Sequence, residues 1–162
     1  MERLRVGIIG CGGIAFGKHL PAVAKIPEVE LAAFCDIIAD RAERAKAEYG
    51  TADAEVYVDY QELLADASID AVHVLTPNDL HAPMTIAALE AGKHVMFEKP
   101  MAKTAQEARA MYQAAQRTGK LLTIAYQNRF REDAQYLYQV CRRGELGEIY
   151  FAKAHAVRRA AV

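Results

Sequence analysis

The chain has 162 residues, of which 52% are apolar and 25% charged, and its formal net charge is −1. This length and composition are typical of one packed globular domain. The near-neutral charge argues against nucleic acid or an anionic membrane as a partner, because both require a basic surplus. No apolar run is long enough to span a bilayer, so we expect no membrane partner.

Sparse cysteines and unclustered histidines limit the chemistry of the chain. Cys11, Cys35 and Cys141 follow no metal-ligand or CxxC spacing. Cys11 and Cys35 lie in or beside apolar runs, which favours small buried side chains over reactive ones. The histidines have no partners at metal-ligand spacing, so we predict no metal site. The odd set of cysteines, with no signal peptide in view, predicts a cytoplasmic protein.

Short apolar runs alternate with segments of helical period along the first 144 residues. In chain order, we predict strands over 4–9, 29–35, 56–58, 71–75, 94–97 and 121–125. The helices are expected to run toward Lys25 with an interruption at Pro21, over 40–49, from Asp59, up to Ala91, from Thr104 to Gly119, and up to Gly144. Asp59 and Thr104 each open a capping-box pattern, with a glutamate three residues later.

Apolar strands that alternate with helices predict an α/β fold, a doubly wound parallel sheet of the NAD(P)-binding Rossmann type that is covered on both sides. Residues 149–157 differ, because their side chains alternate as in a strand with one buried face. We predict an NAD(P)-binding domain over 1–127. Residues 128–162 are expected to form a connecting helix and the first strand of a second α+β domain, otherwise missing here.

A lone strand over 149–157 has no partner for its backbone or its apolar side. We therefore expect this strand to be disordered, exchanged between chains or packed on a neighbour, or the chain to be part of a longer protein.

The segment Gly10-Cys11-Gly12-Gly13-Ile14-Ala15 is a GxGxxA pattern that follows a strand and opens a helix. Gly10 permits the tight turn, Gly12 lets a pyrophosphate approach the backbone, and Ala15 keeps the helix close to the strand. The N-terminus of the helix offers free N–H groups to the phosphates. The alternative is a glycine-rich turn without a ligand.

Asp36 ends the second strand, where an acidic side chain can accept a hydrogen bond from the 2′-hydroxyl of the adenosine ribose. An acid at this place favours NAD and repels the additional phosphate of NADP. Arg41 follows nearby and can accommodate that phosphate, so NADP stays an alternative. Taken alone, Asp36 is also compatible with a turn or a helix cap.

Thr76-Pro77-Asn78 follows the strand over 71–75, and ligands bind at the carboxyl ends of strands in open α/β sheets. These polar residues are candidates for the nicotinamide half of the cofactor. They are equally suited to a turn that starts a helix. His81 lies just beyond them and is predicted to cap or hydrogen-bond that helix.

Glu98-Lys99-Pro100 ends the next strand along the chain and faces the same crevice. A lysine there can donate to a substrate hydroxyl and favour its ionisation as a hydride leaves. A surface lysine paired with Glu98 is the alternative.

Together these motifs resemble the glucose–fructose oxidoreductase / inositol dehydrogenase family (Gfo/Idh/MocA), NAD(P)-dependent oxidoreductases that act mostly on sugars, cyclitols and similar polyols. The resemblance covers nearly the whole chain. It is carried by VGIIGCGGIAFGKHLPA, FCD, DAVHVLTPNDLHAPMTIAALEAGKHVMFEKPMAKT, AYQNRFRED and GELGEIYFAKAHAVRR.

The resemblance implies that Lys99 is catalytic, in contact with the nicotinamide ribose and the substrate hydroxyl, and that the Lys99–Pro100 bond is cis. Asn128 and Arg129 fall where the family places residues near the nicotinamide. The implied cofactor-binding residues are Gly10, Gly12, Gly13, Ile14, Ala15, Asp36, Thr76, Pro77, Asn78, His81, Glu98, Lys99, Asn128 and Arg129.

Members of the family continue for about 150 further residues, the size of a typical domain. That domain builds the substrate pocket and often the dimer or tetramer interface, and it carries a histidine that serves as general acid/base. The resemblance therefore implies a homo-oligomer and a sugar or polyol substrate.

We predict the nucleotide-binding domain of an NAD(P)-dependent sugar or polyol dehydrogenase. The alternatives are a non-catalytic module that binds NAD(H) without turnover and a small-molecule sensor built on the same fold.

Overall fold

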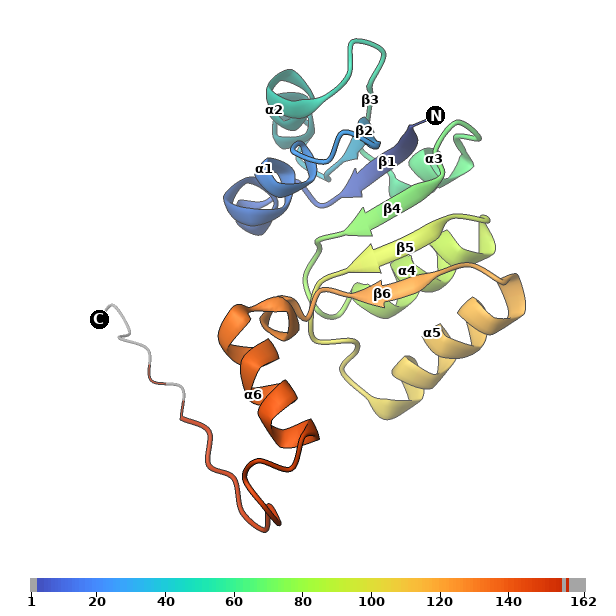
Figure 1. Ribbon diagram of the computed structural model, residues 1–162. Helices are drawn as coiled ribbons and strands as arrows, with labels where there is room; N and C mark the ends of the chain where they lie inside the picture. Colours follow the sequence, from blue (N-terminus) through green and yellow to red (C-terminus); the bar gives the residue numbers. More distant parts are fainter. Residues whose placement is uncertain (1–2, 156, 158–162) are drawn as a thin grey trace. The chain divides into compact units, whose positions relative to one another are not determined.

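The computed structural model describes residues 3–155 and residue 157, and the chain divides into two compact units, Met1–Ala125 and Tyr126–Val162. The first unit is a six-stranded parallel sheet with helices packed on it (Figure 1). Its strands are β1 (Leu4–Ile9), β2 (Val29–Cys35), β3 (Glu55–Tyr57), β4 (Ala71–Val74), β5 (His94–Phe97) and β6 (Leu122–Ile124). Its helices are η1 (Ala15–His19), α1 (Leu20–Val23), α2 (Ala39–Tyr49), α3 (Tyr60–Ala65), α4 (His81–Glu90) and α5 (Ala105–Thr118).

The strand order β3-β2-β1-β4-β5-β6 confirms the predicted doubly wound sheet. β1 pairs with β2 on one side and with β4 on the other, so the chain winds outward in both directions from β1. The connections after β1 and β4 therefore leave the sheet in opposite directions. A crevice at the carboxyl ends of these strands is the place where such folds bind ligands.

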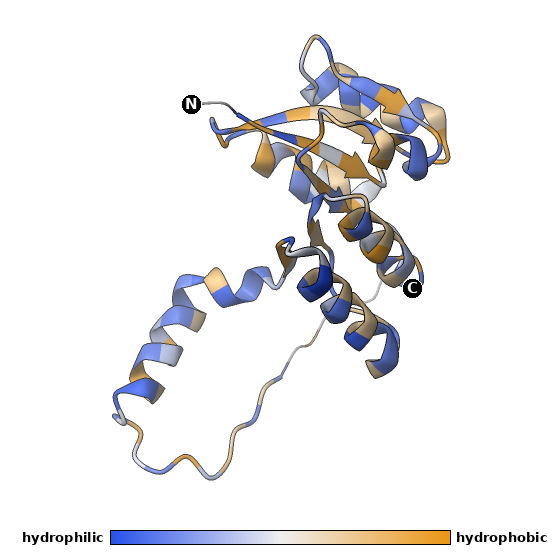
Figure 2. Ribbon diagram, turned by 90° about the vertical axis from the view of Figure 1, so that its right-hand side faces the viewer, coloured by the Kyte–Doolittle hydropathy of each residue, from blue (hydrophilic) through white to orange (hydrophobic). Residues whose placement is uncertain are grey.

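An apolar cluster lies on each face of the sheet. Leu63, Leu89 and Met111 come from α3, α4 and α5 and belong to one cluster. Leu20 and Ala42, from α1 and α2, belong to the other. Figure 2 shows hydrophobic stretches along the strands and hydrophilic residues on the outer sides of the helices.

One face of the sheet is not fully covered at β5, although the sequence predicted cover on both sides. Met96 in β5 pairs with His73 in β4 and Thr123 in β6, so these three side chains share a face. Met96 is 38% exposed, whereas Val95 on the opposite face is buried. The cover on this face is therefore incomplete at β5.

Of the two predicted capping boxes, the one at Thr104 is confirmed, whereas at Asp59 the cap forms without the reciprocal contact of Glu62. Thr104 and Glu107 form the full capping box that starts α5. Asp59 caps α3 by accepting a hydrogen bond from the Gln61 N–H, which satisfies an otherwise unpaired donor of the first turn. Gly119, with φ +67°, ends α5 in the left-handed conformation that glycine favours.

The first helical segment is irregular. It begins as the single π-helical turn η1 and continues as α1, with Pro21 in the first turn of α1. Proline has no N–H to donate to the preceding turn, so the hydrogen-bond pattern changes just before it. The predicted interruption at Pro21 is therefore a change of helix type.

The second unit contains η2 (Gln127–Phe130) and α6 (Glu132–Arg142), and Gly144 lies past the end of α6 with φ +71°. The described residues 149–155 and 157 are not in a strand. The strand expected over 149–157 as the start of a second domain stays a prediction, since a strand needs a partner for its backbone. Position 156 lies outside the described residues.

Within the described ranges, no helix is both long and apolar enough to cross a membrane.

Candidate functional site

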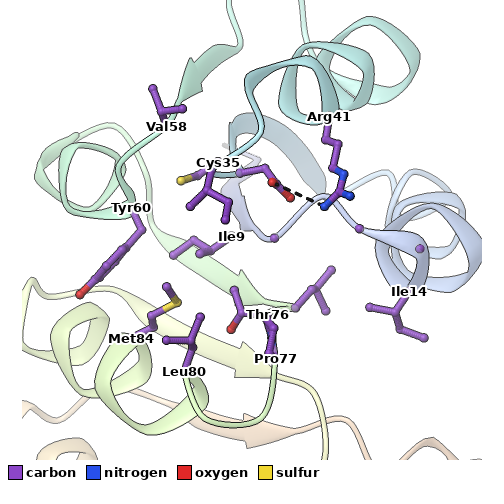
Figure 3. A pocket seen from close by; sticks show the side chains of 16 residues that line it. Ile9, Ile14, Cys35, Arg41, Val58, Tyr60, Thr76, Pro77, Leu80 and Met84 are labelled. Atoms are coloured by element: carbon purple, nitrogen blue, oxygen red, sulfur yellow. Dashed lines mark ion pairs between the residues drawn. The ribbon is translucent and has the colours of Figure 1, made fainter.

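A cavity of about 400 Å³ lies at the carboxyl ends of β1, β2 and β4, within the first unit (Figure 3). This volume falls in the range of small-molecule sites. Its wall combines a glycine turn, a carboxylate and several apolar side chains. The lining residues are Ile9, Gly10, Gly12, Gly13, Ile14, Cys35, Asp36, Ile37, Arg41, Val58, Tyr60, Leu75, Thr76, Pro77, Leu80 and Met84.

The glycine turn has the geometry that the GxGxxA pattern predicts. Gly10 has φ +95°, and a Cβ on it would lie 2.9 Å from the carbonyl carbon and oxygen of Leu75. A side chain is therefore excluded at Gly10 by the neighbouring strand end as well as by its backbone conformation. A Cβ on Gly12 or Gly13 would meet nothing within 4 Å. These two glycines face open space that a ligand can occupy, while Ala15 is fully buried beneath the turn.

Asp36 ties the end of β2 to the glycine turn. Its Oδ2 accepts a hydrogen bond of 2.9 Å from the Cys11 N–H, and its Oδ1 accepts one of 2.9 Å from the Ile38 N–H. The residue is only 8% exposed, yet it lines the cavity. A carboxylate has about four acceptor sites, so Asp36 retains acceptors for a ligand hydroxyl.

Arg41, in the first turn of α2, points its guanidinium toward this carboxylate (Figure 3). Its guanidinium Nη1 lies 4.0 Å from Asp36 Oδ1, a loose ion pair, and its side chain is 53% exposed. At this distance and with an exposed guanidinium, the ion pair contributes little stability, and the Arg41 side chain can rearrange around a ligand.

Cys11 and Cys35 are buried thiols, as predicted. Burial is the main cause that raises the pKa of each thiol to about 12, and the negative charge of Asp36 adds to it. Both therefore stay protonated at neutral pH and are poor nucleophiles.

Within the described residues, no group of histidine, cysteine or acidic side chains could hold a metal ion.

Thr76 and Pro77 lie in the cavity wall, as the sequence indicates for the end of β4. The Thr76 hydroxyl is buried and has no hydrogen-bond partner among the described residues. Buried polar atoms are normally paired, so this hydroxyl fits a wall that a ligand completes. Asn78 does not line the cavity and is exposed.

His81 is fully buried and does not line the cavity. Its Nδ1 lies 2.8 Å from the Pro100 carbonyl oxygen, and its Nε2 lies 3.0 Å from the Thr76 carbonyl oxygen. The ring thus connects the loops that follow β4 and β5. Its predicted part in binding the cofactor stays a prediction.

The Lys99–Pro100 bond is cis, which confirms the expectation from the resemblance. Glu98 is only 9% exposed, while Lys99 is exposed. The Glu98 carboxylate accepts the Lys99 N–H at 3.0 Å and lies 2.7 Å from His19 Nε2. Glu98 is therefore paired with His19. The alternative expected a pair between Glu98 and the Lys99 ammonium, and the structure does not contain that pair among the described residues.

Asn128 and Arg129 belong to η2 in the second unit, so their predicted place near the nicotinamide stays a prediction. Sequence reasoning missed the apolar lining of the cavity, namely Ile9, Ile37, Val58, Tyr60, Leu80 and Met84. It also missed the contact of His19 with Glu98, because no spacing rule joins residues so far apart.

Comparisons with known proteins agree with this geometry. Residues 4–126 match the Gfo/Idh/MocA family, described as an oxidoreductase family with an NAD-binding Rossmann fold. A D-glucoside 3-dehydrogenase of Escherichia coli K12 is 41% identical over 159 residues, which are 98% of this chain and 45% of that protein. An inositol 2-dehydrogenase of Salmonella typhimurium is 35% identical over 147 residues, 90% of this chain and 43% of that protein.

Solved structures show the same fold with cofactors bound. The scyllo-inositol dehydrogenase of Lactobacillus casei, with bound NAD(H) and scyllo-inositol, has a TM-score of 0.83 and 28% identity, covering 91% of this chain and 43% of its own. The 3-ketoreductase KijD10 of Actinomadura kijaniata, in complex with NADP and TDP-benzene, has a TM-score of 0.81 and 32% identity, covering 88% and 43%. The chain thus spans less than half the length of these relatives.

Proposed function

Because the chain belongs to the Gfo/Idh/MocA oxidoreductase family, we propose that it is the nucleotide-binding part of an NAD(P)-dependent dehydrogenase. The substrate is a sugar, cyclitol or related polyol, and a hydride passes between its carbinol carbon and the nicotinamide. The relatives support this class of reaction, since they include a D-glucoside 3-dehydrogenase and inositol 2-dehydrogenases.

The open space over Gly12 and Gly13, bounded by Asp36, is the observation that carries the proposal. The backbone of the glycine turn approaches the pyrophosphate without steric hindrance, and the start of η1 presents N–H groups to it. Asp36 accepts a hydrogen bond from the adenosine ribose. The apolar wall around Ile37 and Val58 excludes water from the adenine side.

NAD is the preferred cofactor in this proposal. The Asp36 carboxylate is buried and already held by two N–H groups, so it cannot easily turn away from an additional phosphate. The negative charges of the Asp36 carboxylate and of a 2′-phosphate beside it repel each other strongly where water is partly excluded. Arg41, 4.0 Å from Asp36, offsets part of this repulsion and leaves weaker binding of NADP.

Lys99 orients and polarises the substrate hydroxyl at the carboxyl end of β5. Bound NAD(H) supplies or accepts the hydride. The exposed ammonium of Lys99 donates to the oxygen on which negative charge develops as the proton leaves. Asn128 and Arg129 contribute to the nicotinamide side, and Asn78 and His81 to the loop beside it.

The first experiment is a titration of NADH and NADPH fluorescence against the chain. NADH is expected to bind more tightly, and Gly12→Ala is expected to abolish binding while the protein remains folded, since a Cβ there meets only the ligand space. Failure of the parent chain to bind either cofactor would overturn the proposal. Binding without turnover of a panel of polyols would favour the non-catalytic module.

Asp36→Asn tests the choice of cofactor. The amide keeps an acceptor for one of the two N–H groups but removes the charge, so the ratio of NADPH to NADH affinity is expected to rise about tenfold. Asp40→Asn, at an exposed position near the start of α2, is the matched control. An unchanged ratio would contradict the ribose assignment.

We also infer a cytoplasmic, homo-oligomeric protein. The free thiols Cys11 and Cys35 are suited to a reducing compartment, and the family resemblance supports the assembly. Fractionation of the native host and light scattering of the purified native protein test the two statements.

A further inference from the structure

Residues 98–100 carry Lys99 at the tip of β5, and a histidine contacts this segment on each side of the lysine. His19 meets the Glu98 side chain, and His81 meets the Pro100 carbonyl oxygen. The two histidines come from different elements, His19 from the end of η1 and His81 from the start of α4.

The contact of His19 with Glu98 is short and largely removed from water. His19 Nε2 lies 2.7 Å from Glu98 Oε1, and the two side chains are 13% and 11% exposed. An ionised carboxylate can only accept, so His19 Nε2 donates. Glu98 Oε2 accepts the Lys99 N–H at 3.0 Å, so both carboxylate oxygens are used and the carboxylate cannot rotate freely.

His73 holds the His19 ring in place. The two rings pack edge to face with centroids 4.5 Å apart, and His73 is buried in β4. Burial, with a smaller contribution from His19, lowers the pKa of His73 to about 3. The ring behind His19 is therefore neutral, and it orients His19 toward Glu98 without competing for the carboxylate.

His81 acts on the other side of Lys99. Its two ring nitrogens lie 2.8 Å from the Pro100 oxygen and 3.0 Å from the Thr76 oxygen. Both partners are carbonyl oxygens, which only accept, so the neutral ring donates to one of them and contacts the other. The ring packs edge to face on Phe97, the last residue of β5. The chain is thus fixed from Phe97 through Pro100, with Lys99 as the exposed residue of the segment.

We propose that His19 and His81 are positioning residues for Lys99. His19 acts through Glu98, and His81 acts through the Pro100 carbonyl. His19 ends η1, the helical turn that directly follows the glycines lining the cavity, so this short segment connects the cavity with Glu98 beside Lys99. The proposal rests on the proposed function of Lys99, but the contacts can be tested without cofactor.

The main experiment records the backbone amide resonance of Lys99 by NMR in the cofactor-free full chain. His19→Leu is expected to shift this resonance upfield, because the Glu98 carboxylate is no longer held against the amide. His19→Gln retains an N–H donor and is expected to restore the parent position. His94→Leu, at the opposite end of β5, is the matched control and should leave it unmoved.

His81→Phe keeps a ring in the buried site and removes both contacts of the ring nitrogens with the carbonyl oxygens. It is expected to shift the Lys99 amide as well, and each of His19→Leu and His81→Phe is expected to weaken NADH binding about fivefold. An unchanged Lys99 amide in either variant would overturn the proposal for that histidine. Loss of NADH binding by the parent chain would instead refute the proposed function, since the amide measurement does not depend on it.

Where a variant fails to fold, the parent protein gives the answer through the nitrogen-15 resonances of its imidazole rings. A protonated His19 Nε2 and a ring N–H of His81 that is protected from exchange support the proposal. An unprotonated His19 Nε2 at neutral pH, or a rapidly exchanging His81 ring N–H, would overturn it.

Discussion

Strand β5 has a lysine near each end, and the surroundings of the two lysines are opposite. Lys93, just before the strand, is 5% exposed and donates to the carbonyl oxygens of Asp66 at 2.6 Å and Ile69 at 2.8 Å. Lys99, just after the strand, is exposed at the ligand edge of the sheet.

This difference separates a structural lysine from the lysine that we propose acts on the substrate. Lys93 satisfies two backbone carbonyls at the amino edge, and burial lowers its pKa although Asp66 and Asp70 oppose that shift. At the carboxyl edge, the protein fixes the residues on both sides of Lys99 and leaves the ammonium available. A buried cation that is paired by the protein stabilises the fold, whereas an available one is ready for a ligand.

The largest expected effect is at Lys93, where a substitution tests its structural role. Lys93→Met is expected to lower the free energy of unfolding by about 3 kcal/mol, because the buried Ile69 carbonyl and the half-buried Asp66 carbonyl lose their donor. Urea denaturation measures this loss, and NADH affinity of the folded variant should be unchanged. Lys25→Met, at an exposed position, is the control. A loss below about 0.5 kcal/mol would show that Lys93 is not a structural lysine.

A second prediction concerns His73, a buried histidine in β4, the strand that pairs with β5. Its pKa is lowered from 6.5 to about 3 in the folded protein, so the folded state resists protonation. Above pH 6.5 His73 is neutral in both the folded and the unfolded state, so its contribution to the free energy of unfolding is fully present. As the pH falls from 6.5 toward 3, only the unfolded chain takes up the proton, and the free energy of unfolding decreases by up to about 1.4 kcal/mol per pH unit.

His73→Leu is expected to remove this part of the acid sensitivity. The difference in unfolding free energy between the parent and the variant should change with pH only below 6.5. Equal slopes in both proteins, measured by urea denaturation at several pH values, would contradict the assignment of His73 as a buried neutral group.

The smallest expected effect is at Lys99. Lys99→Met should weaken NADH binding about tenfold through loss of one charge-assisted hydrogen bond, and leave the unfolding free energy within about 0.5 kcal/mol of the parent. Lys103→Met, four residues further along and exposed, is the control. If Lys99→Met destabilised the fold as much as Lys93→Met, the contrast between the two lysines would disappear.

Much of the fold follows from local patterns. The Thr104 capping box and the left-handed Gly119 depend on a few neighbouring residues, and the structure contains both. The GxGxxA spacing likewise predicted the tight turn at Gly10, and in the structure Gly12 and Gly13 are open to the cavity. The strand expected over 149–157 stays a prediction, because side-chain alternation indicates one buried face but does not identify a partner strand.

The site was predictable only in part. Asp36 and Thr76 follow from the rule that strand ends carry ligand-binding residues, and both line the cavity. The apolar wall, with Leu80 and Met84, was not predicted, since these residues resemble ordinary core positions in the sequence.

The sequence by itself determined the alternation of strands and helices, the glycine turn and the polar strand ends, because each depends on backbone propensity and side-chain period over a few residues. Only the tertiary structure decided which polar groups pair. His19 and Glu98 are 79 positions apart, and His81 and Pro100 are 19 apart. Such contacts depend on the strand order of the sheet, which brings separate elements to one edge. Lys99 is distinguished from Lys93 by this placement, and not by its residue type.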